Sequence, residues 1–332
     1  MRVVVCGTGY GASYLQALWN HASGLRLAGI LARGSDRSQA LARQWGVPLW
    51  RTPDEVPRSA VDAACVAVGW PAARDLTLAF VGRGLPVLAE HPMDPEDVEA
   101  ALAAAREHGT VFHLNSHWAD LETVQPFLAA CAAARQRSRP LFVSAMSNPR
   151  ALYCADLLAR ALGTLQPLEI RSSVPSGQVP SIIPLQGSAA GIPFLLQCHR
   201  LVSSVDDGTA AWTSHHVMIG FPEGHLILGD NAGPAVWVAA PPPVTQMASP
   251  FGPSALAAPA WSLLPPGQPP SFGEHFFGVR ERANRLALAR WADQVRTGRT
   301  HAEQSPEHLL DVSRAWRAML DLLGPFETAA FG

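Results

Sequence analysis

A glycine-rich turn near the amino end constrains the fold of this chain more than any other feature. A short apolar run, Val3–Cys6, leads into the turn Gly7–Ala12, and a helical pattern of apolar side chains follows it. A second apolar run, Leu27–Leu31, comes next. The order of strand, G-x-G-x-x-A turn, helix and strand predicts a parallel α/β unit that binds the pyrophosphate of a dinucleotide at the turn.

Three residues of the turn have distinct physical roles in that prediction. Gly7 permits a tight bend out of the strand, Gly9 lets the backbone approach the pyrophosphate, and Ala12 lets the helix pack closely on the strand. The helix then presents N–H groups and the positive end of its dipole to the phosphates. The cofactor contacts that we expect in the turn are Gly7, Thr8, Gly9, Tyr10, Gly11 and Ala12.

The end of the second apolar run indicates which dinucleotide is bound. Chains that bind NAD usually have Asp or Glu there, which holds the ribose 2′-hydroxyl. Here no acidic residue stands at that point, and Arg33 and Arg37 carry guanidinium groups that suit a 2′-phosphate. The alternative is that both arginines are simply solvated. We expect NADP(H) rather than NAD(H), with contacts from Arg33, Gly34, Ser35 and Arg37.

Apolar runs and helical patterns alternate, with short loops between them, as far as residue 120, which is typical of a doubly wound parallel sheet. Three of the later runs, at 61–68, 86–89 and 110–114, end in polar loops. The carboxyl ends of parallel strands meet at one edge, where such sheets bind ligands. The site residues that we expect at this edge are Gly69, Trp70, Glu90, His91, Asn115, His117 and Trp118.

Beyond residue 120 the pattern changes to longer strands separated by turns. Five strand segments begin at residues 168, 191, 210, 224 and 235. They follow expected helices at 121–137 and 152–162 and a strand at 140–145. This pattern predicts an α+β domain with a large, mainly antiparallel sheet that has one open face. A stretch rich in Pro, Ala, Ser and Gly, Pro241–Phe272, is expected to be a loop, and helices are expected at 274–296 and from 306 to 324.

The chain is therefore expected to have the α/β class and three parts. Residues 1–120 would form an NADP-binding Rossmann domain with a doubly wound parallel sheet. Residues 121–304 would form the α+β domain, which binds substrate and supports oligomerisation. Residues 305–332 would form a carboxy-terminal helix that packs back on the Rossmann domain. Because an open antiparallel sheet face often pairs across a two-fold axis, we expect a homodimer.

Composition excludes several classes of chemistry. The sequence contains no lysine, which excludes Schiff-base and pyridoxal phosphate enzymes and the P-loop lysine. A net charge of −2 provides no basic field for nucleic acid or an anionic membrane. No apolar run approaches the ~20 residues of a membrane span, and no leader pattern precedes the first strand. The five cysteines are widely spaced without a C-x-x-C pair, so we expect reduced thiols and a cytoplasmic protein.

The histidine pairs do not predict a metal site. His113 and His117 are four residues apart, but at a strand end rather than on a helix, and no glutamate follows the first of them. His215 and His216 are neighbours on an expected strand, so their side chains would point to opposite faces of the sheet. We therefore expect no metal ion.

Several segments together resemble a known family. The glycine turn, the tripeptide Glu90–Pro92 and Asn115 at the next strand end resemble the glucose–fructose oxidoreductase superfamily. Within it, the chain is similar over essentially its whole length to the thiazolinyl imine reductases of siderophore biosynthesis. The segments that carry this closer resemblance are LAEHPMDPEDV, HLNSHW, LQGSAAGIPFLLQ, HHVMIGFPEGHLIL and GPAVW.

The resemblance implies NADPH-dependent reduction of a thiazoline C=N bond to a thiazolidine. The substrate of that family is tethered to a carrier protein of a nonribosomal peptide synthetase. Hydride would pass to the imine carbon, and a proton would reach the nitrogen from His91, which stands where sugar-oxidising members have lysine, or from water. The family commonly has a tyrosine near the end of the HLNSHW segment, where this chain has Trp118, whose indole N–H is not an acid at neutral pH. His117 is then the other candidate acid.

Two other functions stay open from the sequence. One is an NADP-dependent sugar or cyclitol dehydrogenase, which the missing lysine disfavours. The other is a non-catalytic NADP-binding regulator, which the replacement by Trp118 leaves open. The stretch Pro241–Phe272 would be either a lid or docking rim for the carrier protein or a plain surface loop.

Overall fold

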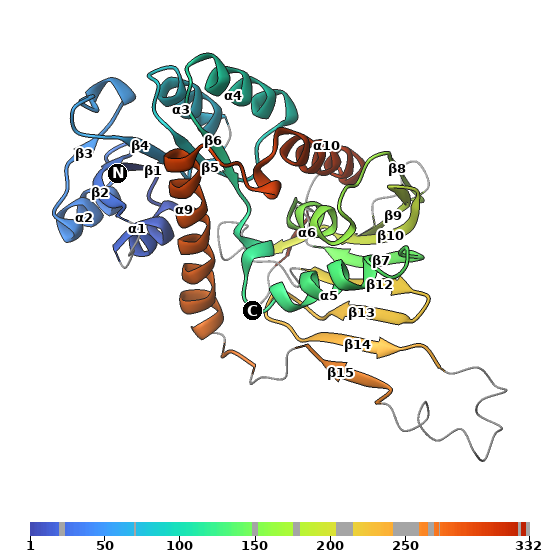
Figure 1. The fold of residues 1–332 in the computed structure, drawn as a ribbon. Coiled ribbons are helices and arrows are strands. Elements are labelled where there is room, and N and C mark those ends of the chain that lie inside the picture. Colours follow the sequence, from blue (N-terminus) through green and yellow to red (C-terminus); the bar gives the residue numbers. More distant parts are fainter. Residues whose placement is uncertain are drawn as a thin grey trace. The chain divides into compact units, whose positions relative to one another are not determined.

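The structure is a computed structural model with two compact units (Figure 1). One unit comprises Met1–Asp120 and Gly273–Arg314, and the other comprises Leu121–Phe272 and Ala315–Gly332. The residues that the structure describes are 1–19, 24–69, 71–147, 152–174, 180–203, 215–241, 259–264, 269–271, 273–324 and 327–329.

The first unit is built on a six-stranded sheet with the order β3-β2-β1-β4-β5-β6. Every neighbouring pair in this sheet is parallel. The order reverses between β1 and β4, so the glycine turn after β1 lies at the switch point where open parallel sheets bind ligands. The predicted doubly wound sheet is confirmed. The strands are β1 (Arg2–Cys6), β2 (Arg26–Leu31), β3 (Leu49–Trp50), β4 (Ala63–Val66), β5 (Val87–Glu90) and β6 (Phe112–Asn115).

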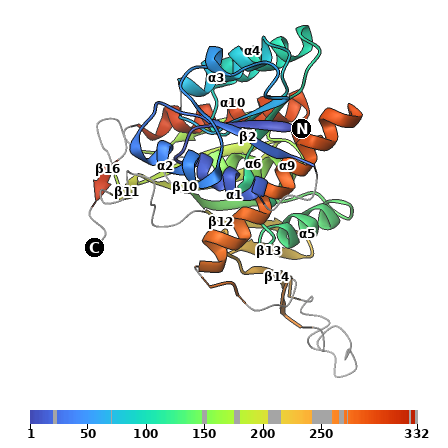
Figure 2. The same cartoon turned by 90° about the vertical axis from the view of Figure 1, so that its left-hand side faces the viewer.

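Helices cover both faces of this sheet, as Figure 2 shows for α3 and α4 on one side and α1 and α2 on the other. The alternation along β1 explains this arrangement, since Val4 and Cys6 join the core under α3 and α4 whereas Val3 and Val5 join the core under α1. The helices are α1 (Gly11–Trp19), α2 (Asp36–Trp45), α3 (Ala72–Val81), α4 (Pro95–Glu107) and α9 (Arg280–Thr297), with short helical turns η1 (Pro53–Glu55), η2 (His117–Asp120), η3 (Glu274–Val279) and η4 (Ala302–Gln304).

The segment after residue 272 is placed differently from our expectation. We expected residues 273–304 in the second domain, but Gly273–Arg314 belongs to the first unit. The reason is apolar packing, because Leu288 and Trp291 of α9 are fully buried in the core that also contains Tyr14 of α1. The following helix α10 (Pro306–Leu323) begins as predicted, with the Ser305 hydroxyl accepting the N–H of His308.

The second unit is built on an eight-stranded sheet with the order β15-β14-β13-β12-β7-β10-β9-β8. Its neighbouring strands are antiparallel except for the parallel pair β7 and β10, which confirms the mainly antiparallel sheet. Helix α5 packs on β13 and β14 (Figure 1). The elements are α5 (Gln125–Arg135), β7 (Phe142–Ser147), α6 (Leu152–Leu162), β8 (Leu168–Ser172), β9 (Ile182–Ala189), β10 (Ile192–His199), β12 (His215–Phe221), β13 (Gly224–Leu228), β14 (Ala235–Ala239) and β15 (Trp261–Leu263); β11 (Leu201–Ser203) pairs with β16 (Glu327–Ala329).

Two strands of this sheet were absent from the prediction. β9 contains Pro184 and Gly187, residue types that usually interrupt a strand pattern. Gly187 is required there, because a Cβ atom would lie 1.9 Å from the carbonyl oxygen of Glu169 on β8. The strand β15 lies inside the stretch Pro241–Phe272 that we expected to be loop throughout, and most of that stretch, including its proposed docking role, falls outside the described residues. No helix in the described ranges has the length and apolarity needed to span a bilayer.

Candidate functional site

The two first glycines of the glycine turn have different surroundings: Gly7 is closely packed, whereas Gly9 is open. Gly7 has φ of +96°, and a Cβ atom there would lie 2.5 Å from the carbonyl oxygen of Ala67, so only glycine fits. Its N–H donates to the carbonyl of Leu31 at 2.9 Å. By contrast, no atom lies within 4 Å of a Cβ position built on Gly9. The backbone is thus open to a ligand at Gly9, just before α1 begins, and a pyrophosphate fits this position.

The turn after β2 carries arginine side chains on its surface. Arg33 and Arg37 are exposed, and Ser35 caps α2 by accepting the N–H of Ser38 at 3.3 Å. Gly34 lies between them with φ of +89°, and a Cβ atom on it would lie 3.2 Å from Nε of Arg51. Arg51 was missed in the sequence, although it directly follows β3, the strand that pairs with β2.

Buried polar side chains meet at the carboxyl ends of β5 and β6. Tyr14 of α1 donates its hydroxyl hydrogen to Glu90 Oε2. The amide of Asn115 lies 2.5 Å from the Tyr14 hydroxyl and 3.3 Å from Glu90 Oε2. Burial, together with the Glu90 carboxylate, holds the pKa of the Tyr14 phenol well above its usual range. Tyr14 therefore stays protonated and fixes the position of Glu90.

His117 connects this cluster to the glycine turn. Its Nδ1 atom lies 3.5 Å from Glu90 Oε1 and 2.9 Å from the hydroxyl oxygen of Tyr10. The rings of Tyr10 and His117 are stacked, with centroids 5.4 Å apart and an angle of 24°. Tyr10 comes from the turn and His117 from η2, more than a hundred residues later, so the fold joins two residues that we had assigned to separate roles.

A residue from α9 completes the network. The Oδ1 atom of Asn284 accepts a hydrogen bond from Asn115 Nδ2 at 3.3 Å. Its Nδ2 atom donates to the Tyr10 hydroxyl at 3.3 Å and to Ser13 Oγ at 3.2 Å. Asn284 is fully buried. We did not predict a role for it, because nothing in the arginine-rich helix pattern marks one asparagine as facing the glycine turn.

The other expected site residues lie around this network. His91 is buried directly after Glu90, and its backbone N–H donates to the carbonyl of Asn115 at 3.0 Å. Trp118 contacts both the guanidinium of Arg280, 4.4 Å from the indole centroid, and the His117 ring, whose centroid is 4.6 Å away. Gly69 is exposed after β4, and Trp70 lies outside the described residues.

Three further histidines, His113, His215 and His216, lie on strands. His113 is buried on β6, and on β12 His215 is buried while His216 is exposed, as the alternation of a strand predicts. Within the described parts of the chain, no group of three or more His, Cys, Asp or Glu side chains is arranged to bind a metal ion.

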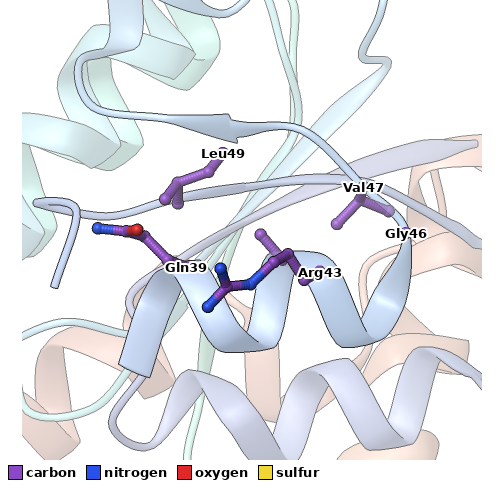
Figure 3. A pocket seen from close by; sticks show the side chains of 6 residues that line it. Gln39, Arg43, Gly46, Val47 and Leu49 are labelled. Carbon is purple, nitrogen blue, oxygen red and sulfur yellow. The ribbon is translucent and has the colours of Figure 1, made fainter. Parts of the chain in front are cut away.

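A shallow hollow of about 390 Å³ lies on α2 and the start of β3 (Figure 3). The Gln39 side chain on its wall donates to the carbonyl of Gly34 at 2.8 Å, so the hollow borders the arginine-bearing turn. None of the predicted site residues lines it. The lining residues are Gln39, Ala42, Arg43, Gly46, Val47 and Leu49.

A comparison with protein families supports a dinucleotide-binding turn in the first unit. Residues 1–116 match the family model described as "Oxidoreductase family, NAD-binding Rossmann fold" (GFO_IDH_MocA). The amino-terminal segment is thus similar to the NAD-binding Rossmann domain of these oxidoreductases. No curated protein matches the sequence.

Solved structures show the same fold over nearly the whole chain. An oxidoreductase from Agrobacterium radiobacter, solved with NAD+, L-tartaric acid and magnesium, is 12% identical with a TM-score of 0.73, covering 97% of this chain and 96% of that one. UDP-N-acetylglucosamine 3-dehydrogenase from Acidithiobacillus ferrooxidans is 14% identical with a TM-score of 0.70, covering 97% of each chain. A putative myo-inositol dehydrogenase from Sinorhizobium meliloti is 15% identical with a TM-score of 0.69 and the same coverage. At these identities the likeness shows the fold alone.

Proposed function

We propose, on the premise that residues 1–116 are an NAD-binding oxidoreductase domain, that this chain is an NADPH-dependent reductase of a cyclic C=N bond. The substrate that we propose is a thiazoline, presented by a carrier protein of a nonribosomal peptide synthetase and reduced to a thiazolidine. The observation that carries the proposal is the Tyr10–His117–Glu90 network beside the glycine turn, in which His117 and Glu90 are buried and Tyr10 is partly exposed. It places proton-bearing side chains next to the turn that suits a dinucleotide.

The residues that would hold the cofactor fit NADPH. The open backbone at Gly9 suits the pyrophosphate, and the turn that carries Arg33, Arg37 and Arg51 suits the 2′-phosphate. When bound, the reduced nicotinamide supplies a hydride. The chain's own residues then need to deliver one proton to the imine nitrogen, which also makes the imine carbon more electrophilic.

The absence of lysine supports an imine rather than an alcohol as substrate. In the family that this chain resembles, sugar-oxidising members have a lysine directly after the glutamate that corresponds to Glu90. That lysine helps to remove an alcohol proton, and this chain has His91 in its place. Imine reduction requires proton delivery instead, which a histidine or a phenol in a hydrogen-bonded network performs at neutral pH.

The test is to mix the purified protein with NADPH or NADH and a thiazoline, either free or loaded on a carrier protein, and to follow the nicotinamide absorbance. We expect NADPH oxidation with the thiazoline, faster with the carrier-bound form, and tighter binding of NADPH than of NADH. Binding of NADPH without turnover of any thiazoline, sugar or cyclitol would instead support a non-catalytic regulator. A preference for NADH would overturn the assignment of the arginines.

The second candidate is oxidation of a sugar or cyclitol hydroxyl group. The fold likeness to proteins named UDP-N-acetylglucosamine 3-dehydrogenase and myo-inositol dehydrogenase favours it. In that direction the same network would accept a proton rather than deliver one. Reduction of NADP+ by a panel of nucleotide sugars and cyclitols, with no oxidation of NADPH by thiazolines, would replace the first candidate with this one.

We also propose that the protein is a homodimer that pairs through the sheet face opposite α5. Strand register aligns one residue from each of six neighbouring strands, and five of these residues are apolar, with Ser144 of β7 between Leu195 and Met218. Leu195 and Leu263, at the two ends of this row, are 37% and 41% exposed, and exposed leucines in a row of apolar side chains are typical of an interaction surface. A two-fold axis would let this row pack against its own copy. The row consists of Leu195, Met218, Ile227, Val236 and Leu263.

A further inference from the structure

We propose that Tyr10 is the catalytic acid of the reductase, and that His117 and Asn284 are positioning residues that hold its hydroxyl group. This inference rests on the proposed function and deepens it. It moves to Tyr10 the role of proton donor that the sequence suggested for His91.

The first argument is access. The network contains four ionisable side chains, those of Tyr10, Tyr14, Glu90 and His117. Three of them are buried, with Tyr14 at 0%, His117 at 1% and Glu90 at 9% exposed, whereas Tyr10 is partly exposed. Tyr10 also belongs to the glycine turn, where the cofactor is expected. A proton that passes from this network to a ligand therefore leaves through the Tyr10 hydroxyl.

The second argument is how the hydroxyl is held. The Tyr10 oxygen accepts a hydrogen bond from Asn284 Nδ2 at 3.3 Å and lies 2.9 Å from His117 Nδ1. An amide donor on the phenol oxygen stabilises the negative charge that develops when the phenol loses its proton. The ring is fixed as well, by stacking on His117 and an edge contact with Tyr14 at 5.9 Å.

The third argument is proton balance. The Tyr10 O–H bond breaks as the N–H bond of the product forms, while the hydride and its electron pair come from NADPH. The resulting phenolate takes a proton from His117, and the Glu90 carboxylate, 3.5 Å from His117 Nδ1, balances a positive charge on the imidazole. After the product leaves, water returns a proton to His117 by way of the Tyr10 hydroxyl, so the net reaction consumes one proton from solvent.

The two neighbouring aromatic side chains are unsuited to the same role. Trp118 has only an indole N–H, which is not an acid at neutral pH, and its ring faces Arg280. Tyr14 is fully buried and donates its hydroxyl hydrogen to Glu90. Tyr10 is thus the phenol of this network that combines a held oxygen with access from outside.

The experiment compares the wild type with Tyr10→Phe, which removes only the hydroxyl group and keeps both ring contacts. We expect kcat for thiazoline reduction to fall by roughly 100-fold or more, in line with the loss of a general acid, while NADPH affinity and the melting temperature stay close to wild type. The pH profile of kcat should lose the limb that reports the acid. The comparison variant is His91→Gln, for which we expect a smaller loss.

A second readout needs neither cofactor nor substrate. In the cofactor-free protein labelled with ¹⁵N-histidine, Tyr10→Phe should shift the His117 ring nitrogen resonances, because the phenol is their hydrogen-bond partner. Unchanged His117 resonances, or kcat within threefold of wild type, would overturn the proposal for Tyr10. A wild-type protein that reduces no thiazoline would overturn the proposed function itself, so the two failures are distinct.

Discussion

At the scale of single residues, Gly7 and Gly9 have different requirements although both belong to one motif. Gly7→Ala combines a strained φ with a clash against the Ala67 carbonyl, so we expect it to lower the free energy of unfolding by about 2–4 kcal/mol. Gly9→Ala meets no neighbour and should change stability by less than about 0.5 kcal/mol while weakening NADPH binding. Urea denaturation and fluorescence titration measure the two effects. Normal cofactor binding by Gly9→Ala would contradict a pyrophosphate at this turn.

His215 should make stability depend on pH. Burial lowers the pKa of His215 to about 4, and the charge of Asp230 opposes this shift only in part. The unfolded chain, with a pKa of about 6.5, therefore binds more protons between about pH 6.5 and pH 4. The free energy of unfolding is therefore unaffected by His215 above about pH 6.5. It falls by up to about 3 kcal/mol as the pH is lowered from about 6.5 to about 4, because protons bind the unfolded chain more tightly.

This prediction has a matched control on the same strand. His215→Leu should flatten the dependence of unfolding free energy on pH between about pH 6.5 and pH 4. His216→Leu, which changes the exposed neighbour, should leave that dependence as in wild type. Equal slopes in the wild type and in His215→Leu would show that His215 is accessible to protons in the folded state.

At the scale of elements, a side chain takes the place of a seventh strand in the first unit. β6 is an edge strand, and the Gln304 amide accepts the N–H of Leu114 at 2.9 Å and donates to its carbonyl at 3.0 Å. Gln304→Leu would leave two buried backbone groups without these partners, so we expect a loss of about 2–4 kcal/mol in urea unfolding. Gln44→Leu, at an exposed position of α2, is the control and should be near neutral. A similar small effect for both variants would mean that water replaces the amide.

At the scale of the whole molecule, the proposed homodimer depends on the apolar row of the open sheet face. Leu195→Glu places a charge at one end of the apolar row and should convert a dimer into a monomer in sedimentation velocity experiments. Leu286→Glu changes another exposed leucine, on α9 of the first unit, and should leave the sedimentation coefficient unchanged. A wild-type monomer would rule out the dimer, and a Leu195→Glu dimer would locate the interface elsewhere.

The sequence by itself determined the features that depend on local patterns. Apolar periodicity and turn chemistry identified the parallel sheet, the switch-point turn, the antiparallel sheet and most helix boundaries, since each is encoded within a few consecutive residues. The same information brought Glu90, Asn115 and His117 to one edge, because the ends of parallel strands meet there. The strand β9 was not predicted, because its proline and glycine interrupt the local strand pattern.

Only the tertiary structure decided the contacts between distant segments. The return of α9 to the first unit, which buries Asn284 against the glycine turn, depends on packing across more than two hundred residues. The approach of Arg51 to Gly34 and the stacking of Tyr10 on His117 likewise have no local signal. Such contacts depend on which apolar faces of helices and sheets pack against each other, and residue spacing along the chain does not predict that packing.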